Sequence, residues 1–292
     1  MNRILHLFEW RLNDITKELS DIKNQGFNCI QISPIQPLKE YTYAWWSLYQ
    51  PCDLTIGNSW IGSQGDLSLL CNKAENYGIK IIADVVICHM AGKNNGELKP
   101  HEMVNKELLN NKDYWLEPKM INDWNNRYEV THYSMGLPRL NIYNHEVQDK
   151  IIKFLDGLYA SGVKGFRVDA AKNIALPQEG CDFYTRVMDR YKDLFVYSEL
   201  IFTDRHLLDE YSKYTMILTE SECVDNKKIA YFESHDSFLD DTLGYTKNMD
   251  QNRVIDEYVI KCKYFDNTLF YNRPNSKMYL DKRIKEANLM NT

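Results

Sequence analysis

Short apolar runs alternate with stretches of helical periodicity along most of this chain. The runs "RILHLFE", "CIQISP" and "KIIADVVICH" have the length and the β-branched content of buried strands. The segments between them repeat their apolar residues every three to four positions, as amphipathic helices do. This order of elements is typical of βα units around a parallel sheet.

The two helices expected between these runs have recognisable starts. We expect the first to open at Asn13 and to end before Gly26, with Ile15, Leu19 and Ile22 on its apolar face. For the second, "SQGD" at residues 63–66 has the form of a capping box. Its apolar face would carry Leu67, Leu70, Ala74 and Tyr77.

The alternation of strand-like runs and helical segments stops in residues 90–144. These residues are rich in Asn, Lys, Trp and Tyr, and their apolar positions have neither a helical nor a strand period. We expect a small inserted domain there, between a first barrel part at residues 1–89 and a second at residues 145–292. The rhythm resumes with a helix from about Asn144 that delivers the strand "VKGFRVD". Further candidate strands are "LFVYSEL" (194–200), "TMILTES" (215–221), "IAYFES" (229–234) and "TLFYNR" (268–273), and "SKMYLDKRIKEANLMNT" is a candidate final helix.

Eight strands with intervening helices predict an α/β fold, a (β/α)₈ TIM barrel with the small inserted domain after its third strand. One gap disagrees with a regular barrel. Only "ECVDNKK" separates the sixth strand from the seventh, whereas a parallel crossover usually needs a dozen or more residues. Either the sixth helix is missing, or one of these strands is misassigned.

The composition says little more about the fold, but it restricts the kinds of partner and function that the chain can have. The net charge of −6 is spread along the chain and argues against a nucleic-acid partner, so a neutral substrate fits better. Nothing in the composition suggests a membrane span, and the 13% of aromatic residues suits either a core or sugar stacking. Seven cysteines without metal-ligand spacing indicate free thiols. The segment "MNRILHLFEW" does not resemble a signal peptide, so we expect a cytoplasmic protein unless a leader was removed.

Polar residues follow the predicted strands at the ends that a TIM barrel uses for chemistry. They are Asp84, His89, Arg167, Asp169, Glu199, His235 and Asp236. Two carboxyl groups across a scissile bond are what glycoside hydrolysis needs, one as nucleophile and one as acid and then base. Taken alone, each acid is more often a helix cap or an ion-pair partner, and Asp169 could simply pair with Arg167.

The segments "DVVICH", "GFRVDAAK", "SEL" and "ESHD" have the order and spacing of the short motifs of the α-amylase family of glycoside hydrolases, which this chain resembles. The resemblance extends to "SPIQPLKE", "WWSLYQP", "IGNSWIGSQGDL", "NDWNNRYEVT" and "LFYNRP". It implies that Asp169 is the nucleophile, Glu199 the general acid/base and Asp236 the stabiliser of the transition state. Arg167 would keep Asp169 ionised, while Glu199 should lie in a less charge-compensated environment and keep its proton.

The same resemblance implies a set of substrate-binding residues. His89 and His235 would bond sugar hydroxyls, Asp84 would brace the site, and Tyr49 would stack on the sugar at the cleaved bond. Trp46 and Gln50 would serve neighbouring subsites and Lys172 the reducing side, while Trp45 is as readily a core residue. Retention of anomeric configuration follows, with the carboxyl groups of Asp169 and Glu199 roughly 5–5.5 Å apart.

Two positions depart from the family's calcium site. Cys88 stands where an Asn ligand is usual, and Arg139 stands in "GLPRLN" where an Asp ligand is expected. Because a thiol is a poor partner for Ca²⁺ and a guanidinium repels it, we expect no metal and no cofactor, with Arg139 taking over part of the charge-bridging role. The alternative is a shifted loop that binds Ca²⁺ through other oxygens.

Two further positions depart from relatives in the family. Asn173 replaces the usual His after Lys172, which should alter the reducing-side subsites. Ser234 stands where chloride-dependent members carry Asn, so we expect no chloride activator.

The leading hypothesis is a retaining, endo-acting α-1,4-glucan hydrolase that acts on starch, glycogen or maltodextrins. The alternatives are a non-catalytic glucan-binding protein on the same barrel, and a transglycosylase or short α-glucoside hydrolase of the same family. The β-sandwich domain that usually follows the barrel is not expected here. Self-association through the barrel flank without a helix is the one macromolecular partnership that we expect.

Overall fold

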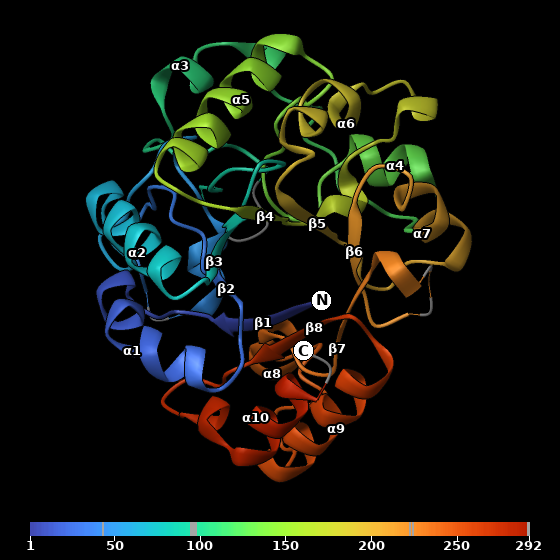
Figure 1. Cartoon of the computed structure of the whole chain (residues 1–292). Helices are drawn as coiled ribbons and strands as arrows, with labels where there is room; N and C mark the ends of the chain where they lie inside the picture. Colours follow the sequence, from blue (N-terminus) through green and yellow to red (C-terminus); the bar gives the residue numbers. More distant parts are fainter. Residues whose placement is uncertain (43, 94–97, 222, 224, 291–292) are drawn as a thin grey trace.

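The computed structural model describes residues 1–42, 44–93, 98–221, 223 and 225–290, and it contains a closed barrel of eight parallel strands (Figure 1). The strands follow one another in chain order, and β1 pairs with β8 to close the barrel. They are β1 (Asn2–Leu7), β2 (Cys29–Ile32), β3 (Lys80–Val85), β4 (Gly165–Val168), β5 (Phe195–Glu199), β6 (Met216–Leu218), β7 (Lys228–Tyr231) and β8 (Asn267–Tyr271). The predicted TIM barrel is confirmed.

Helices form a ring outside the strands (Figure 1). The long ones are α1 (Leu12–Asn24), α2 (Gln64–Asn76), α5 (His145–Ala160), α9 (Gln251–Tyr264) and α10 (Lys282–Leu289). Asn291 and Thr292, at the end of the candidate final helix, lie outside the described residues. The shorter ones are η1 (Trp45–Tyr49), α3 (Lys106–Leu109), η2 (Lys112–Tyr114), α4 (Arg127–His132), η3 (Ala171–Asn173), η4 (Pro177–Glu179), α6 (Phe183–Arg186), η5 (Met188–Tyr191), α7 (Arg205–Tyr211), η6 (Asp225–Lys227), α8 (His235–Leu239) and η7 (Met278–Leu280).

Local sequence explains most helix starts. Ser63 caps α2 in the predicted capping box, and the Asn144 side chain caps α5. The expected start of α1 at Asn13 is wrong, because the helix begins one residue earlier. The backbone N–H of Leu12 donates to the carbonyl of Ile61, so a long-range contact sets this start. The expected inward face of Tyr77 is also wrong, since α2 ends at Asn76 and Tyr77 is exposed.

The link between β6 and β7 is as short as the sequence indicates. The two strands pair in parallel, with Ile217 opposite Lys228, so neither is misassigned. In the part of the link that the structure describes, only the 3₁₀ turn η6 occurs; Glu222 and Val224 lie outside the described residues. Within those residues, the missing sixth helix is therefore the correct alternative.

The predicted insertion leaves the barrel after β3 and returns to it before α5. It contains α3, η2 and α4, and residues 94–97 within it lie outside the described part. Its two ends are tied to the barrel side by backbone hydrogen bonds, from Ala91 N–H to the Pro51 carbonyl and from Leu140 N–H to the Cys88 carbonyl. The insertion is thus anchored next to the end of β3.

Gly165, the first residue of β4, has a steric role. A Cβ atom at this position would lie 2.3 Å from the carbonyl oxygen of Phe195, which begins β5. Backbone atoms cannot yield as a flexible side chain can, so the close approach of β4 to β5 requires glycine here.

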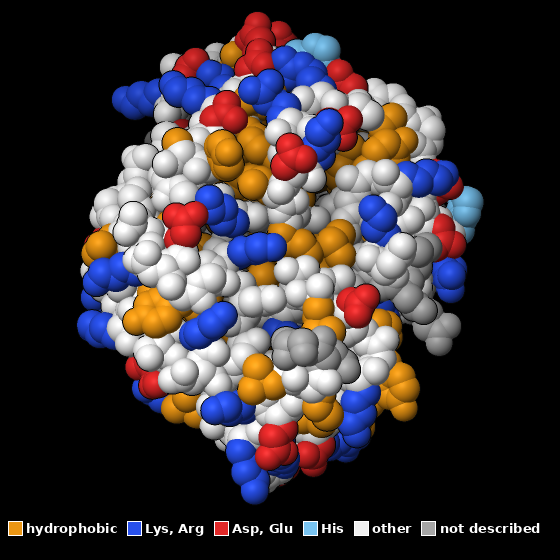
Figure 2. Space-filling view, in the orientation of Figure 1, with side chains coloured by type: hydrophobic (Ala, Val, Ile, Leu, Met, Phe, Trp, Pro, Cys, Tyr) orange, Lys and Arg blue, Asp and Glu red, His pale blue; other side chains and the backbone are white. Residues whose placement is uncertain are grey.

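The face of the molecule seen in Figure 2 carries acidic and basic side chains that are interspersed, which fits a partner without a strong charge of one sign. None of the helices in the described ranges combines the length and the apolar character needed to cross a membrane.

The short link between β6 and β7 leads to a prediction. Because the described part of this link contains only η6 where a regular barrel has a helix, we expect copies of the chain to associate through this flank. Sedimentation velocity should show a sedimentation coefficient that rises with protein concentration. A constant monomer value at high concentration would contradict this expectation.

Candidate active site

A cavity of about 510 Å³ opens at the carboxyl ends of the strands. Asp169 directly follows β4, Glu199 is the last residue of β5, and Asp236 is the second residue of the short helix α8 after β7. The lining consists of Trp45, Trp46, Tyr49, Gln50, His89, Met135, Gly136, Leu137, Asp169, Ala170, Glu199, Ile201, His235, Asp236 and Asp240. The fold therefore brings the three predicted catalytic acids together.

Arg167 lies beneath these acids and is 1% exposed. Its Nη1 donates to both carboxylate oxygens of Asp84, at 2.8 and 3.0 Å, and to Oδ1 of Asp169 at 2.7 Å. Its Nη2 donates to Oε1 of Glu199. One guanidinium thus orients three carboxyl groups from three neighbouring strands.

Asp84 is fully buried, and its other contact runs to the cavity wall. The hydroxyl of Tyr49 donates to its Oδ2 at 2.9 Å, and His89 Nε2 lies 2.9 Å from the carbonyl oxygen of Tyr49. Burial raises the pKa of Asp84 to about 7, against the opposing effect of Arg167. Asp84 and Arg167 therefore lie below the cavity lining, where they support the residues that form it.

Glu199 is set up to keep its proton. Burial raises its pKa to about 8, the Arg167 cation opposes that shift, and the charges of Asp236 and Asp169 add to it. The sequence led us to expect fewer compensating charges around Glu199, yet Arg167 contacts it directly. Its second oxygen, Oε2, accepts a hydrogen bond from the backbone N–H of Ala170 at 3.1 Å. Ala170 has a backbone φ of 48°, in the left-handed region that residues other than glycine rarely adopt.

Asp236 has a similar environment. Burial raises its pKa to about 7, Arg167 acts in the opposite direction, and Asp169 and Asp84 raise it further. The carboxyl groups around Arg167 thus outnumber its single positive charge, so the site favours at least one protonated acid.

His235 lies nearly parallel to two rings, with its centroid 4.6 Å from that of Phe8 and 5.2 Å from that of Tyr49. Burial lowers its pKa well below the usual value, so the imidazole is neutral. Burial also lowers the pKa of His89. The buried atoms His89 Nδ1, His235 Nδ1 and Gln50 Oε1 have no hydrogen-bond partner in the described part of the chain.

Other predicted residues fall into two groups. Trp46 lines the cavity, and so does Trp45, whose ring centroid lies 5.6 Å from that of His235. Lys172 instead lines a separate hollow of about 730 Å³ together with Trp124, and its Nζ donates to the carbonyl of Phe202 at 2.7 Å.

Part of the lining was not predicted. Met135, Gly136 and Leu137 come from the insertion, whose sequence has no period that would point them at the barrel. Ile201 and Asp240 follow Glu199 and Asp236 closely in sequence. That proximity was the only signal that could have found them.

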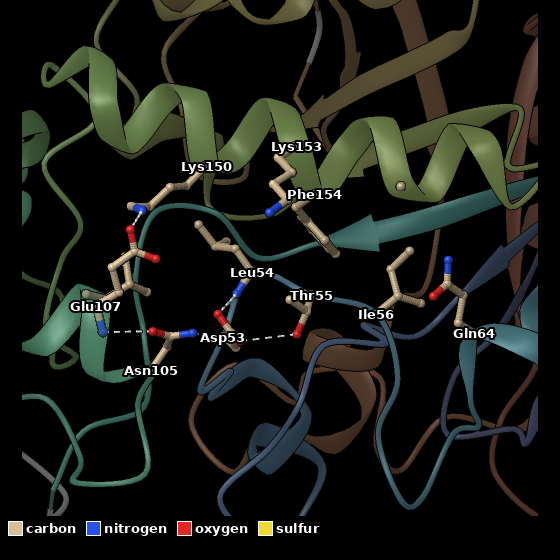
Figure 3. Close-up of a pocket in the computed structure, with 12 residues that line it drawn as sticks. Asp53, Leu54, Thr55, Ile56, Gln64, Asn105, Glu107, Lys150, Lys153 and Phe154 are labelled. Atoms are coloured by element: carbon tan, nitrogen blue, oxygen red, sulfur yellow. Dashed lines mark hydrogen bonds and ion pairs between the residues drawn. The ribbon is translucent and has the colours of Figure 1, made fainter.

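A separate hollow of about 340 Å³ lies between α5 and the insertion (Figure 3). Several of its polar side chains bond one another: Lys150 pairs with Glu107 at 2.5 Å, and Asn105 donates to Asp53 at 3.0 Å. None of the strand-end acids is among its described lining residues, so the barrel mouth is the candidate active site.

The described residues contain no group of three or more His, Cys, Asp or Glu side chains that could hold a metal ion. Cys88 and Arg139, the two positions where the sequence departs from the expected calcium site, are both buried.

The family model described as "Alpha amylase, catalytic domain" matches residues 11–282. An alpha-amylase of Clostridium acetobutylicum is 40% identical over 174 residues, which cover 59% of this chain and 23% of that protein. An alpha-amylase of Butyrivibrio fibrisolvens is 26% identical over 343 residues, with 94% of this chain and 35% of that protein covered. The chain thus spans well under two thirds of the length of these relatives.

Solved structures show the same fold. An alpha-amylase from Geobacillus thermoleovorans, complexed with acarbose, superposes with a TM-score of 0.77 at 18% identity, covering 99% of this chain and 78% of that one. A mutant of alpha-amylase I from Eisenia fetida, in complex with maltohexaose, gives 0.70 at 20% identity, covering 94% and 68%.

Removal of the central cation gives a second prediction. Arg167→Met should lower the free energy of unfolding by about 3–5 kcal/mol, because it leaves buried carboxyl groups without their partner. Without the guanidinium, the pKa values of these groups in the folded state rise further above their unfolded values, so the native state binds more protons than the unfolded chain. The loss should therefore be larger at pH 8 than at pH 5.

Urea unfolding at both pH values measures this effect. The control is Arg205→Met, which removes an exposed ion pair to Asp209 on α7 and should change stability by less than about 1 kcal/mol. Equal losses in the two variants, or a loss that does not depend on pH, would count against the central role of Arg167.

Proposed function

Since the chain belongs to the alpha-amylase family of glycoside hydrolases, we propose that it hydrolyses internal α-1,4-glucosidic bonds of starch, glycogen or maltodextrins with retention of configuration. The observation that carries the proposal is the meeting of Asp169, Glu199 and Asp236 at one cavity, over the single cation of Arg167. The complexes of two structural neighbours with acarbose and with maltohexaose support an α-glucan as the substrate.

In the first step, Glu199 gives its proton to the glycosidic oxygen while a carboxylate oxygen of Asp169 attacks the anomeric carbon. The bond to the leaving sugar breaks and an ester between Asp169 and the remaining glycosyl group forms. Arg167 holds Oδ1 of Asp169, and we assign the attack to Oδ2. A pKa of about 8 for Glu199 leaves it protonated at neutral pH, as this step requires.

In the second step, the carboxylate of Glu199 takes a proton from a water molecule, whose oxygen attacks the anomeric carbon. The ester breaks, Asp169 leaves as a carboxylate, and the product keeps its original configuration. Asp236 would accept hydrogen bonds from hydroxyls of the distorted sugar in both transition states. Its position on the cavity wall beside Glu199 supports this role.

The cavity offers polar atoms that suit sugar hydroxyls. Gln50, His89 and His235 line it from different segments, and we assign their polar side chains hydrogen bonds to the bound glucan. The rings of Trp46 and Tyr49 supply apolar surface for the sugar faces. Lys172, in a separate hollow, would contact the reducing side of a longer chain.

Two other activities share this geometry. A non-catalytic glucan-binding protein would bind the same polymer without cleaving it. A transglycosylase would pass the glycosyl group of Asp169 to a sugar hydroxyl instead of water. Product analysis on maltoheptaose separates these cases, since longer oligosaccharides form only by transfer.

Substitution of the acids provides the direct test. Asp169→Asn should abolish the release of reducing sugar from starch, because an amide does not form the ester intermediate. Glu199→Gln should lower kcat by about 10²–10⁴-fold. The control Asp149→Asn changes an exposed acid on the outer face of α5 and should leave activity intact. Activity of Asp169→Asn equal to that of the unmodified protein would refute the proposed mechanism.

The pH dependence follows from the environment of Glu199. A general acid must be protonated, so kcat/KM should decline as the pH rises through about 8 and the proton is lost. Initial rates on maltoheptaose, measured over a pH series, test this limb. The residual activity of Glu199→Gln should lack it, because an amide does not titrate. An alkaline limb centred well below neutral pH would contradict the assignment.

A further inference from the structure

The guanidinium of Arg139 is buried without an acidic partner. The residue is 3% exposed. Its Nη1 donates to the carbonyl oxygens of Val130 at 2.9 Å and Tyr133 at 2.8 Å, and its Nη2 donates to the carbonyl of Asn173 at 2.7 Å. In the described part of the chain, no carboxylate forms an ion pair with it. Three main-chain oxygens therefore solvate this charge.

These contacts join three segments. Through its backbone, Arg139 forms an antiparallel bridge with His89, just beyond β3. Val130 lies in α4 and Tyr133 directly follows it, both within the insertion. Asn173 ends the turn η3 after β4, the strand that leads to the proposed nucleophile. The side chain of Arg139 thus ties the insertion to the turn after β4, while its backbone bridges to the segment beyond β3.

Asn173 strengthens the same junction. Its Nδ2 donates to the carbonyl oxygen of Val130 at 2.8 Å, the oxygen that also accepts from Arg139. Its backbone N–H donates to the carbonyl of Ala170 at 3.0 Å, and Ala170 N–H in turn contacts Glu199. The junction therefore continues directly into the candidate active site.

The donor set does not fit calcium. Ca²⁺ takes six to eight oxygen ligands. The Cys88 thiol is fully buried and offers sulfur instead of oxygen. The guanidinium of Arg139 lies where the three carbonyl oxygens converge, and its positive charge would repel a second cation at that point.

We propose that the guanidinium of Arg139 takes the place of a bound metal ion and holds the insertion against the turn that follows β4. The fold around the barrel mouth then needs no Ca²⁺. This inference does not depend on the proposed activity, because thermal unfolding tests it.

The first experiment uses the unmodified chain. Its melting temperature, measured by differential scanning calorimetry, should be the same in excess EDTA and in excess CaCl₂, and titration calorimetry should detect no tight binding of Ca²⁺. A melting temperature that rises with CaCl₂, or tight binding, would overturn the proposal.

Variants test whether the guanidinium of Arg139 occupies the position that a bound metal ion would otherwise take. Arg139→Met should lower the melting temperature more than the control Arg205→Met, which removes an exposed ion pair to Asp209 on α7. Equal effects of these two substitutions would overturn the proposal. Cys88→Asn combined with Arg139→Asp restores two oxygen ligands, so this double variant should gain a melting temperature that rises with CaCl₂. A folded double variant that ignores CaCl₂ would also overturn it.

Discussion

A single buried guanidinium, that of Arg167, determines how the carboxyl groups at the barrel mouth are oriented and which of them hold protons. It is bonded to carboxyl groups that follow from β3, β4 and β5, and it lies below the cavity where water does not reach it. One positive charge cannot balance all of the acids around it, so the site must hold protons at neutral pH. Burial and crowding thereby raise the pKa of Glu199 to about 8, so this acid keeps the proton that the proposed chemistry requires.

The insertion contains a second buried guanidinium that holds several segments together. Arg139 is also a buried guanidinium, but main-chain carbonyls surround it instead of carboxylates. The first cation organises groups that can exchange protons, whereas the second organises groups that cannot. Because Met135, Gly136 and Leu137 lie only a few residues before Arg139, the segment that forms a wall of the cavity is the same one that this cation fixes in place.

Sequence patterns predicted what short-range physics determines. The capping box at Ser63 and the Asn144 cap depend on side chains within three residues of the helix start, and both were predictable. The acids at strand ends were also predictable, because the barrel fixes where strands finish. The start of α1 was not, since it depends on a contact to Ile61 across a long separation. The contact between Arg167 and Glu199 likewise joins two strands whose spacing no local pattern contains.

Gly165 shows how a residue without a side chain enters the chemistry. It is the first residue of β4, the strand that leads to Asp169, and it lies opposite Phe195 in β5, the strand that ends in Glu199. No atom larger than hydrogen fits between Gly165 and the carbonyl of Phe195. The distance between two reacting carboxyl groups decides whether a glycosidase retains or inverts configuration. A methyl group on Gly165, at the end of the barrel opposite the cavity, would push β4 away from β5. The retention of configuration that we propose therefore depends on the absence of a side chain at Gly165 as well as on the acids themselves.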